Sequence, residues 1–169
     1  MNERLSAWNE SSAGDALDAM IACCSARRWA EGMVASRPIA SVQELSATAD
    51  RIWGRMGEAD WLEAFACHPR IGERTAAHGS KKSVAWSQQE QSSANRADVE
   101  VLEGLAAGNL LYEERFGFAY IVCATGKSAE EMLTILNRRL DRDRAAELRE
   151  AAEQQRQITQ IRLGKWLVE

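Results

Sequence analysis

The stretch SAEEMLTILNRRL, residues 128–140, carries the two signals that decide the fold. Ser128 stands three residues before Glu131, which is the spacing of a capping box, where the serine and the acid each satisfy an amide at the start of a helix. Met132, Leu136 and Leu140 then recur at intervals of four residues, so one face of such a helix is apolar. The stretch therefore predicts an amphipathic helix.

The same two signals recur along the chain, and little interrupts them. Proline occurs only at Pro38 and Pro69. A chain of 169 residues has the usual length of one domain. We therefore expect an all-α fold, a single-domain helical bundle of about six to eight helices over residues 1–169. Four further capping pairs are Ser12/Asp15, Ser41/Glu44, Asp60/Glu63 and Ser87/Glu90, and further apolar stripes lie in 17–24, 45–56, 62–66, 102–106 and 148–161.

Two segments depart from the helical pattern. The sequence FGFAYIVC, residues 116–123, is rich in aromatic and β-branched residues and is compatible with a buried strand. A single strand would have no partner elsewhere in the chain, so we predict a buried loop that leads into a helix. Residues 73–83 hold His78-Gly79 and two lysines, and we expect an exposed loop with a solvated His78.

Charge and hydropathy exclude several classes of protein. The formal net charge of −4 argues against a nucleic-acid binder, which would carry a basic excess. The longest uncharged stretch, residues 116–126, is too short to span a bilayer. The N-terminal sequence MNERLSAWNESS has no apolar run of the kind found in signal peptides, which predicts a cytoplasmic protein with its four cysteines reduced.

His68 is a candidate proton-transfer residue because of the proline that follows it. A residue before proline is pushed out of the α region, so His68 should sit extended at the end of a helix, where its ring can point into a cleft. Histidine is the usual proton shuttle near neutral pH. Position alone also allows a packed or capping histidine.

The segment Ser87-Gln-Gln-Glu90-Gln91 has two compatible interpretations. It fits a capping box, and it could also offer a helix N-terminus with Ser87, Glu90 and Gln91 to a polar ligand. Arg162, in the last predicted helix, could reach solvent, pair with an acid or bind an anion. The cysteines and histidines do not have the spacing of a zinc site, so we expect no metal site. The chain has no G-x-S-x-G motif, which argues against a nucleophilic serine. An isoleucine stands at 121 where a phosphate-binding loop needs glycine, which argues against a nucleotide site.

Taken in order, several motifs resemble the 2-oxo-4-hydroxy-4-carboxy-5-ureidoimidazoline (OHCU) decarboxylase family. The resemblance covers roughly residues 17–163, and the ordered set at these separations is more specific than any one motif. The motifs are Arg37-Pro38, His68-Pro69-Arg70-Ile71-Gly72, Ser87-x-x-Glu90-Gln91, Tyr112-x-x-x-Phe116-Gly117-Phe118 running into residues 120–124, and Glu153 through Ile158 to Arg162-Leu163.

The resemblance implies a cofactor-free, all-α enzyme, often a homodimer, that acts on the small molecule OHCU. It implies that His68 is the catalytic histidine and that Arg162 is the basic residue of the substrate pocket. Residues that would contact the substrate on the same grounds are Pro69, Ser87, Glu90, Gln91 and the backbone of Tyr120, Ile121, Val122, Cys123 and Ala124.

The function implied is decarboxylation of OHCU to (S)-allantoin in urate and purine catabolism. We expect His68 to donate a proton and Glu90 to interact with the substrate hydroxyl, and these two roles could be exchanged. The alternative is a non-enzymatic helical module, in which some of the six tryptophans anchor a protein interface.

Overall fold

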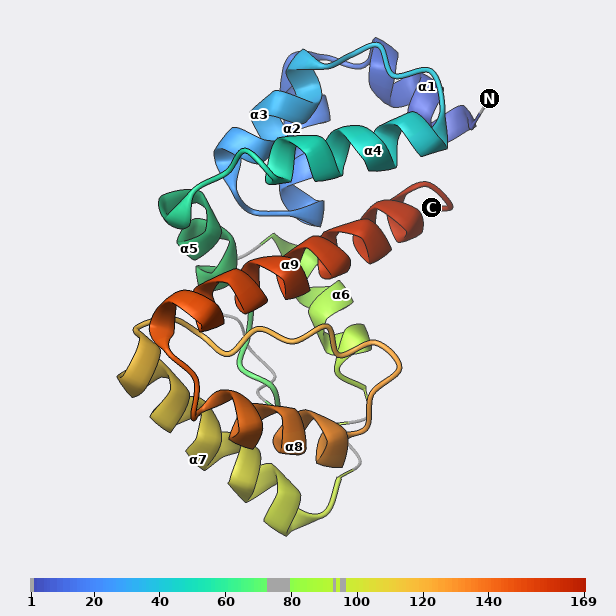
Figure 1. Ribbon diagram of the computed structural model, residues 1–169. Helices are drawn as coiled ribbons and strands as arrows, with labels where there is room; N and C mark the ends of the chain where they lie inside the picture. Colours follow the sequence, from blue (N-terminus) through green and yellow to red (C-terminus); the bar gives the residue numbers. More distant parts are fainter. Residues whose placement is uncertain (1, 73–79, 93, 95–96) are drawn as a thin grey trace. The chain divides into compact units, whose positions relative to one another are not determined.

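The computed structural model describes residues 2–72, 80–92, 94 and 97–169, and within these ranges it has nine helices and no strand (Figure 1). The all-α prediction is therefore confirmed, while the expected six to eight helices are slightly too few. Three short helices precede Ser36, where the sequence pattern suggested fewer. The helices are α1 Glu3–Glu10, α2 Ala13–Cys23, α3 Arg27–Ala35, α4 Val42–Trp53, α5 Glu58–Ala66, α6 Lys81–Glu90, α7 Val99–Phe116, α8 Ala129–Arg139 and α9 Arg144–Trp166.

Three of the predicted helix starts are confirmed. Ser12, Ser41 and Ser128 are the N-caps of α2, α4 and α8, and each serine side chain accepts the N–H of the residue three positions later. At Ser128 the box is complete, because the Glu131 carboxylate accepts the Ser128 N–H at 2.7 Å. Each cap satisfies amides that the helix itself leaves unpaired.

Two predicted starts are wrong. Asp60 lies inside α5, where its carboxylate accepts the N–H of Gly57 at 3.0 Å. Ser87 lies in the last turn of α6, and the cap of that helix is Ser80, whose hydroxyl accepts the Ser83 N–H at 3.1 Å. Residues 81–83 are thus helical rather than part of a loop, and the predicted loop residues 73–79, with His78, lie outside the described residues.

The chain divides into two compact units, Met1–Ala64 with Arg156–Glu169 and Phe65–Gln155. The long helix α9 contributes residues to both. The single-domain organisation over residues 1–169 stays a prediction.

Tryptophans form much of the core of the first unit. Trp8 packs edge-to-face against Trp166, with ring centroids 6.0 Å apart, and donates its indole N–H to the Ala16 carbonyl at 3.0 Å. Trp29 is fully buried and donates to the Ala49 carbonyl at 3.1 Å. An amphipathic ring of this size contributes apolar burial while its single donor finds a partner.

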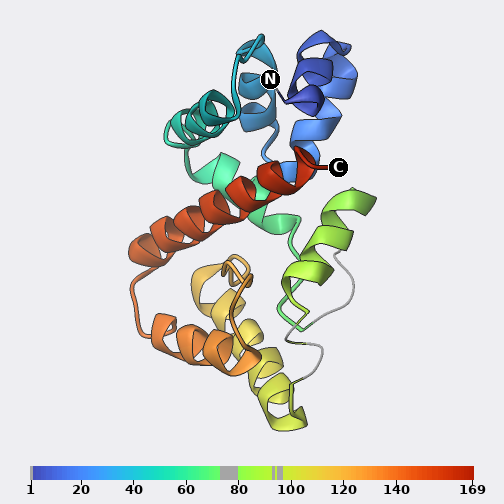
Figure 2. The ribbon, with the colours of Figure 1, turned by 90° about the vertical axis from the view of Figure 1, so that its right-hand side faces the viewer.

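In the second unit, α7 and α8 pack closely against each other (Figure 1). Figure 2 shows the same pair of helices in yellow and orange from a second direction. The approach is possible because Gly108 has no side chain: a Cβ there would lie 2.5 Å from Cδ2 of Leu136. Helix α7 ends at Gly117, whose φ of 80° suits glycine and reverses the chain.

The segment after α7 is a buried loop, as predicted. Residues 118–127 form neither helix nor strand, and every residue from Tyr120 to Ala124 is buried. The aromatic rings of Phe118 and Tyr120 both pack against Tyr112, with centroids 5.8 and 5.4 Å away. Apolar packing therefore holds this loop in the core without a ladder of strand hydrogen bonds. Among the described residues, no helix combines the length and apolar character needed to cross a bilayer.

Candidate functional site

His68 lies just beyond the end of α5, as its place before proline predicts. Its backbone N–H donates to the Phe65 carbonyl at 3.1 Å, which closes the helix, and Pro69 is buried beside it. The imidazole Nε2 lies 2.6 Å from Oε1 of Gln155, a buried residue of α9. The ring is therefore held by a defined partner.

The segment that follows His68 is anchored on both sides. Arg70 makes a two-pronged ion pair with Glu113 of α7, with both N···O distances 2.7 Å. Asn109 of α7 donates its side-chain amide to the Ile71 carbonyl at 3.3 Å. Gly72 has a φ of 91°, which favours glycine. These contacts anchor the HPRIG motif to α7 next to the histidine.

Gln91 joins α6 to this segment. Its side-chain carbonyl accepts the N–H of Gly72 at 3.1 Å, and the residue is buried. Ser87 is buried in the last turn of α6, and Glu90, half-buried, is the last residue of that helix. Because they are three residues apart, Ser87 and Glu90 lie on one face of the helix.

The position of these residues corrects the expectation of a helix N-terminus at Ser87. Ser87 and Glu90 lie at the C-terminal end of α6, where the helix dipole presents its negative pole. A serine three residues before an acid satisfies the spacing of a capping box and equally that of two neighbours on one helical face. The backbone amides of a helix start are therefore not available at Ser87, while the side chains of Ser87 and Glu90 stay candidates for the site.

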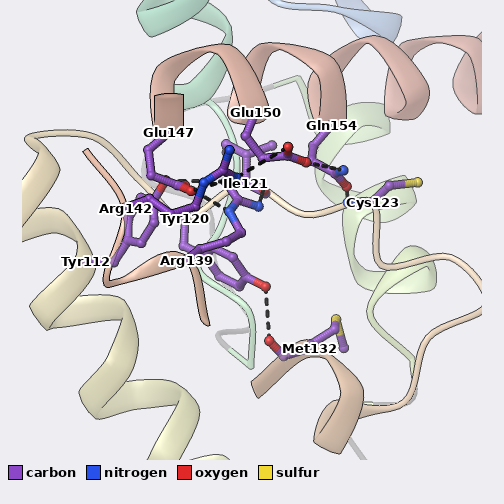
Figure 3. A network of polar contacts seen from close by, with 10 residues as sticks. All are labelled: Tyr112, Tyr120, Ile121, Cys123, Met132, Arg139, Arg142, Glu147, Glu150 and Gln154. Carbon is purple, nitrogen blue, oxygen red and sulfur yellow. Dashed lines mark hydrogen bonds and ion pairs between the residues drawn. The ribbon is translucent and has the colours of Figure 1, made fainter. Parts of the chain in front are cut away.

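The buried loop of residues 120–124 is tied to α8 and α9 (Figure 3). The Cys123 N–H donates to Oε1 of Gln154 at 2.8 Å, and Gln154 in turn donates to Glu150 at 2.9 Å. Arg139 donates to the Ile121 carbonyl at 2.7 Å, and Tyr120 donates its hydroxyl to the Met132 carbonyl at 3.0 Å. Some polar groups of the loop thus have partners within the protein.

Behind the loop lies a buried ionic network (Figure 3). Nε of Arg139 donates to Oε2 of Glu147 at 2.8 Å, and the Tyr112 hydroxyl donates to the same oxygen at 2.5 Å. Both charged side chains are at most 5% exposed. Nη1 of Arg142 lies 3.3 Å from Oε1 of Glu147, an ion pair without hydrogen-bond geometry.

The two tyrosines beside this network are kept neutral. Burial raises the pKa of Tyr112, and the hydrogen bond to Glu147 and the charge of Glu147 raise it further, against the opposing charge of Arg139. Burial likewise raises the pKa of Tyr120. Tyr112 therefore acts as a hydrogen-bond donor, and the Arg139 guanidinium also lies over both rings, 5.7 Å and 5.0 Å from their centroids.

All of the predicted site residues except Arg162 lie in one of the two units. His68, Pro69, Ser87, Glu90, Gln91 and residues 120–124 all belong to the unit Phe65–Gln155. Arg162 belongs to the other unit and is 2% exposed. Among the described residues, no group of three or more His, Cys, Asp or Glu side chains is arranged to hold a metal ion.

Sequence reasoning missed Gln154, Gln155, Arg139 and Glu147. A signal was present in the last helix, because Glu147, Gln155 and Arg162 fall at helical spacing among apolar positions such as Ala151 and Ile158. Polar residues on an apolar stripe are buried, and buried polar groups need partners. Arg139 has no comparable signal.

This all-α arrangement defines a helical protein with a candidate proton-transfer histidine, held before a buried proline in the same unit as a buried irregular loop. A sequence model of the OHCU decarboxylase family matches residues 9–164. The chain therefore belongs to the OHCU decarboxylase family. The resemblance drawn from the motifs is confirmed, and with it the enzyme class, a carboxy-lyase of urate degradation.

Relatives and solved structures agree with this assignment. The chain is 38% identical over 145 residues to the uric acid degradation bifunctional protein TTL of Arabidopsis thaliana, an alignment that covers 85% of this chain and 44% of that protein. It thus spans less than half of that relative. It is 29% identical over 136 residues to the 2-oxo-4-hydroxy-4-carboxy-5-ureidoimidazoline decarboxylase of Haloferax volcanii, covering 80% and 79% of the two chains. A crystal structure of OHCU decarboxylase in the presence of (S)-allantoin matches with a TM-score of 0.78 at 33% identity, over 90% of this chain and 99% of that one.

Proposed function

We propose that this chain converts OHCU to (S)-allantoin, with His68 and Glu90 as its catalytic residues. The observation that carries the proposal is the setting of His68. The imidazole is held 2.6 Å from a buried amide, and the segment after it is anchored to Glu113, Asn109 and Gln91. Membership of the OHCU decarboxylase family supports OHCU as the substrate. The structural match to an OHCU decarboxylase crystallised in the presence of (S)-allantoin supports (S)-allantoin as the product.

The substrate supplies its own electron sink. One ring carbon of OHCU bears a carboxylate and a hydroxyl and stands next to a C=N bond. When the bond to the carboxylate breaks, its electron pair moves into the ring towards the C=N nitrogen, and CO2 leaves. The ring nitrogen that received the electron pair takes up a proton. The hydroxyl then becomes the ring carbonyl as it loses its proton, and the neighbouring carbon, which carries the ureido group, gains one. This chemistry needs oriented acid and base groups but no cofactor.

Two side chains suit the two proton transfers. Glu90, half-buried at the end of α6, accepts the proton of the substrate hydroxyl. His68 delivers a proton to one face of the ring carbon, which gives a single enantiomer. If Glu90 donated the proton and His68 accepted one, the defects of the His68→Ala and Glu90→Gln variants would be exchanged. The experiment below therefore separates the two assignments of roles.

The remaining predicted residues bind the substrate in this proposal. Pro69 and Ser87 line the pocket, and Gln91 offers its amide nitrogen while its oxygen holds Gly72. Residues 120–124 present backbone groups to the polar ring, and Arg162 pairs with the substrate carboxylate. A polar ring bound away from water requires partners of this kind for its donors and acceptors.

The test is a coupled assay followed by circular dichroism. OHCU is generated in place from urate by urate oxidase and hydroxyisourate hydrolase, and the (S)-allantoin signal is recorded. Loss of a general acid or base costs about 10²–10⁴-fold, so His68→Ala and Glu90→Gln should fall by that factor. If His68 donates the final proton, its variant releases CO2 but forms allantoin with reduced enantiomeric excess. Glu90→Gln instead slows the loss of the hydroxyl proton, so the (S)-allantoin signal lags behind CO2 release.

Matched controls are available within the chain. His78→Ala removes the other histidine, and Glu130→Gln changes an exposed acid on α8, and both should keep full activity. Near-normal turnover in both His68→Ala and Glu90→Gln would contradict the proposed roles. No acceleration over spontaneous OHCU decay by the folded wild-type chain would contradict the function and favour the protein-interaction module.

We also propose that the chain forms a homodimer, as its resemblance to the OHCU decarboxylase family implies. The exposed leucines Leu110 and Leu111, 57% and 56% exposed on α7, support a covered surface there. Analytical ultracentrifugation of the wild type and of the variant carrying Leu110→Glu and Leu111→Glu tests this. A monomeric wild type at micromolar concentration would refute it. The cytoplasmic location stays a prediction.

A further inference from the structure

We infer that Gln155 is a positioning residue that decides which ring nitrogen of His68 faces the reacting carbon. The contact joins Nε2 of His68 to Oε1 of Gln155 at 2.6 Å. An amide oxygen can only accept a hydrogen bond, so Nε2 must carry the hydrogen. The other nitrogen, Nδ1, is then the one that gains and loses a proton.

The burial of Gln155 makes this constraint strong. The residue is 1% exposed, so its amide oxygen has no ready substitute in bulk water. Gln155 also lies within α9, a rigid element, which holds a partner more accurately than a loop does. The Nε2–H bond persists whether the imidazole is neutral or charged, because only Nδ1 titrates. The ring therefore need not move during a proton-transfer cycle.

A neutral amide suits a proton donor better than a carboxylate would. A carboxylate beside the ring favours the imidazolium and raises the histidine pKa, so that the proton is harder to release. An amide orients the ring without adding a charge. In the reaction, the Nδ1–H bond of the imidazolium breaks, the proton joins the ring carbon, and neutral His68 remains with its hydrogen on Nε2. This step rests on the proposed function, whereas the orientation of the ring does not.

The neighbouring residue strengthens the argument. Gln154 accepts the Cys123 N–H at 2.8 Å (Figure 3). Two consecutive glutamines of α9 therefore contact the two parts of the candidate site. One side chain holds the buried loop of residues 120–124, and the next holds the catalytic histidine. The spacing between these parts is thus set by two adjacent positions of a single helix, whose side chains point about 100° apart around its axis.

The first experiment reads the tautomer directly. The chain has two histidines, so a ¹⁵N-labelled sample gives two sets of ring-nitrogen resonances, which His68→Ala assigns. We expect neutral His68 in the wild type to carry its proton on Nε2. A proton on Nδ1 would overturn the inference, because Gln155 would then be the donor. This measurement needs no substrate, so it stands even if the chain has no decarboxylase activity.

The second experiment uses two variants. Gln155→Leu removes the hydrogen bond between Nε2 and residue 155, so kcat should fall roughly 10–100-fold with little change in KM, the scale of a loss of orientation. Gln155→Glu keeps the acceptor and adds a charge, so it should keep the Nε2–H tautomer and raise the His68 pKa in the NMR titration. The exposed Gln43→Leu on α4 is the matched control.

The outcomes separate this inference from the proposed function. An active wild type with unchanged kcat in Gln155→Leu overturns the positioning role, even though the function holds. An inactive wild type overturns the proposed function. The NMR measurement of the His68 tautomer then decides by itself whether Gln155 orients the imidazole ring. If Gln155→Leu does not fold, Gln155→Glu decides, because an unchanged His68 pKa in that variant would show that residue 155 does not contact the ring.

Discussion

Replacing Glu147 with glutamine keeps the size of the side chain but removes the charge that Arg139 faces. In the wild type, Nε of Arg139 lies 2.8 Å from the carboxylate, and the Tyr112 hydroxyl donates to the same oxygen. Glu147 is fully buried, and the Arg139 side chain is 5% exposed. The variant therefore leaves a guanidinium in the core without its counter-ion.

The expected loss follows from that burial. Removing one partner of a buried ion pair costs about 3–5 kcal/mol of unfolding free energy, because the remaining charge stays desolvated. For a chain of this length, such a loss lowers the melting temperature by roughly 6–20 °C. A matched control is Glu150→Gln, since Glu150 is partly exposed and its pair with the exposed Arg142, at 3.6 Å, is worth under about 1 kcal/mol.

Urea unfolding followed by far-ultraviolet circular dichroism measures these differences. A double variant, Arg139→Met with Glu147→Leu, sharpens the test because it removes both charges together. It should lose less than the sum of the two single variants. The remaining cost comes from two buried groups left without these partners, the Ile121 carbonyl and the Tyr112 hydroxyl, at about 1–3 kcal/mol each. A loss below 1 kcal/mol in Glu147→Gln, or a double variant equal to the sum of the singles, would refute the reasoning.

Three further predictions test other parts of the structure. Gly108→Ala places a Cβ 2.5 Å from Leu136 where α7 meets α8, so it should cost about 1–3 kcal/mol in urea unfolding. Ser128→Ala removes the cap of α8 and should cost about 1 kcal/mol by the same measurement. The hydrogen bond from Arg70 lowers the pKa of Glu113, so the pair stabilises the fold above the ordinary carboxylate pKa of 4.5, and this stabilisation is lost as the pH falls through the lower, folded-state value. Glu113→Gln should therefore be less stable than the wild type by at most about 1 kcal/mol at pH 7, and the difference should vanish in acid.

Each of these predictions has a control or a contrary result. Gly14→Ala, on α2, meets only Ser12 at 3.8 Å and should be neutral or slightly stabilising, so an equal loss at both glycines would contradict the steric argument. Thr134→Ala, at an exposed position of α8, should leave stability unchanged, unlike Ser128→Ala. A Glu113→Gln difference that grew as the pH fell would contradict the sign of the pKa shift.

Local signals were sufficient for the fold class. The caps at Ser12, Ser41 and Ser128 and the apolar stripes depend on residues within one or two turns of each other, so the sequence shows them directly. The same holds for His68, since the steric effect of Pro69 acts on the residue before it. The motif order was also enough to identify the family before any contact was known.

The same kind of signal failed at Ser87. A serine followed by an acid three residues later fits both the first and the last turn of a helix, and the cap at Ser80 decides between them. Residues 116–123 posed a similar ambiguity, because aromatic and β-branched residues fill a buried strand or a buried loop equally well. Packing of Phe118 and Tyr120 against Tyr112 decides for the loop.

The sequence by itself thus determined the all-α fold class, the family and the identity of the candidate catalytic histidine. Only the tertiary structure decided what that histidine touches and what holds the loop of residues 120–124. His68 and Gln155 are 87 positions apart, and Arg139 reaches Ile121 across 18. Contacts at such separations follow from how the helices pack. Helical spacing can show that a polar residue such as Gln155 lies on a buried face, but it does not show which distant residue becomes its partner.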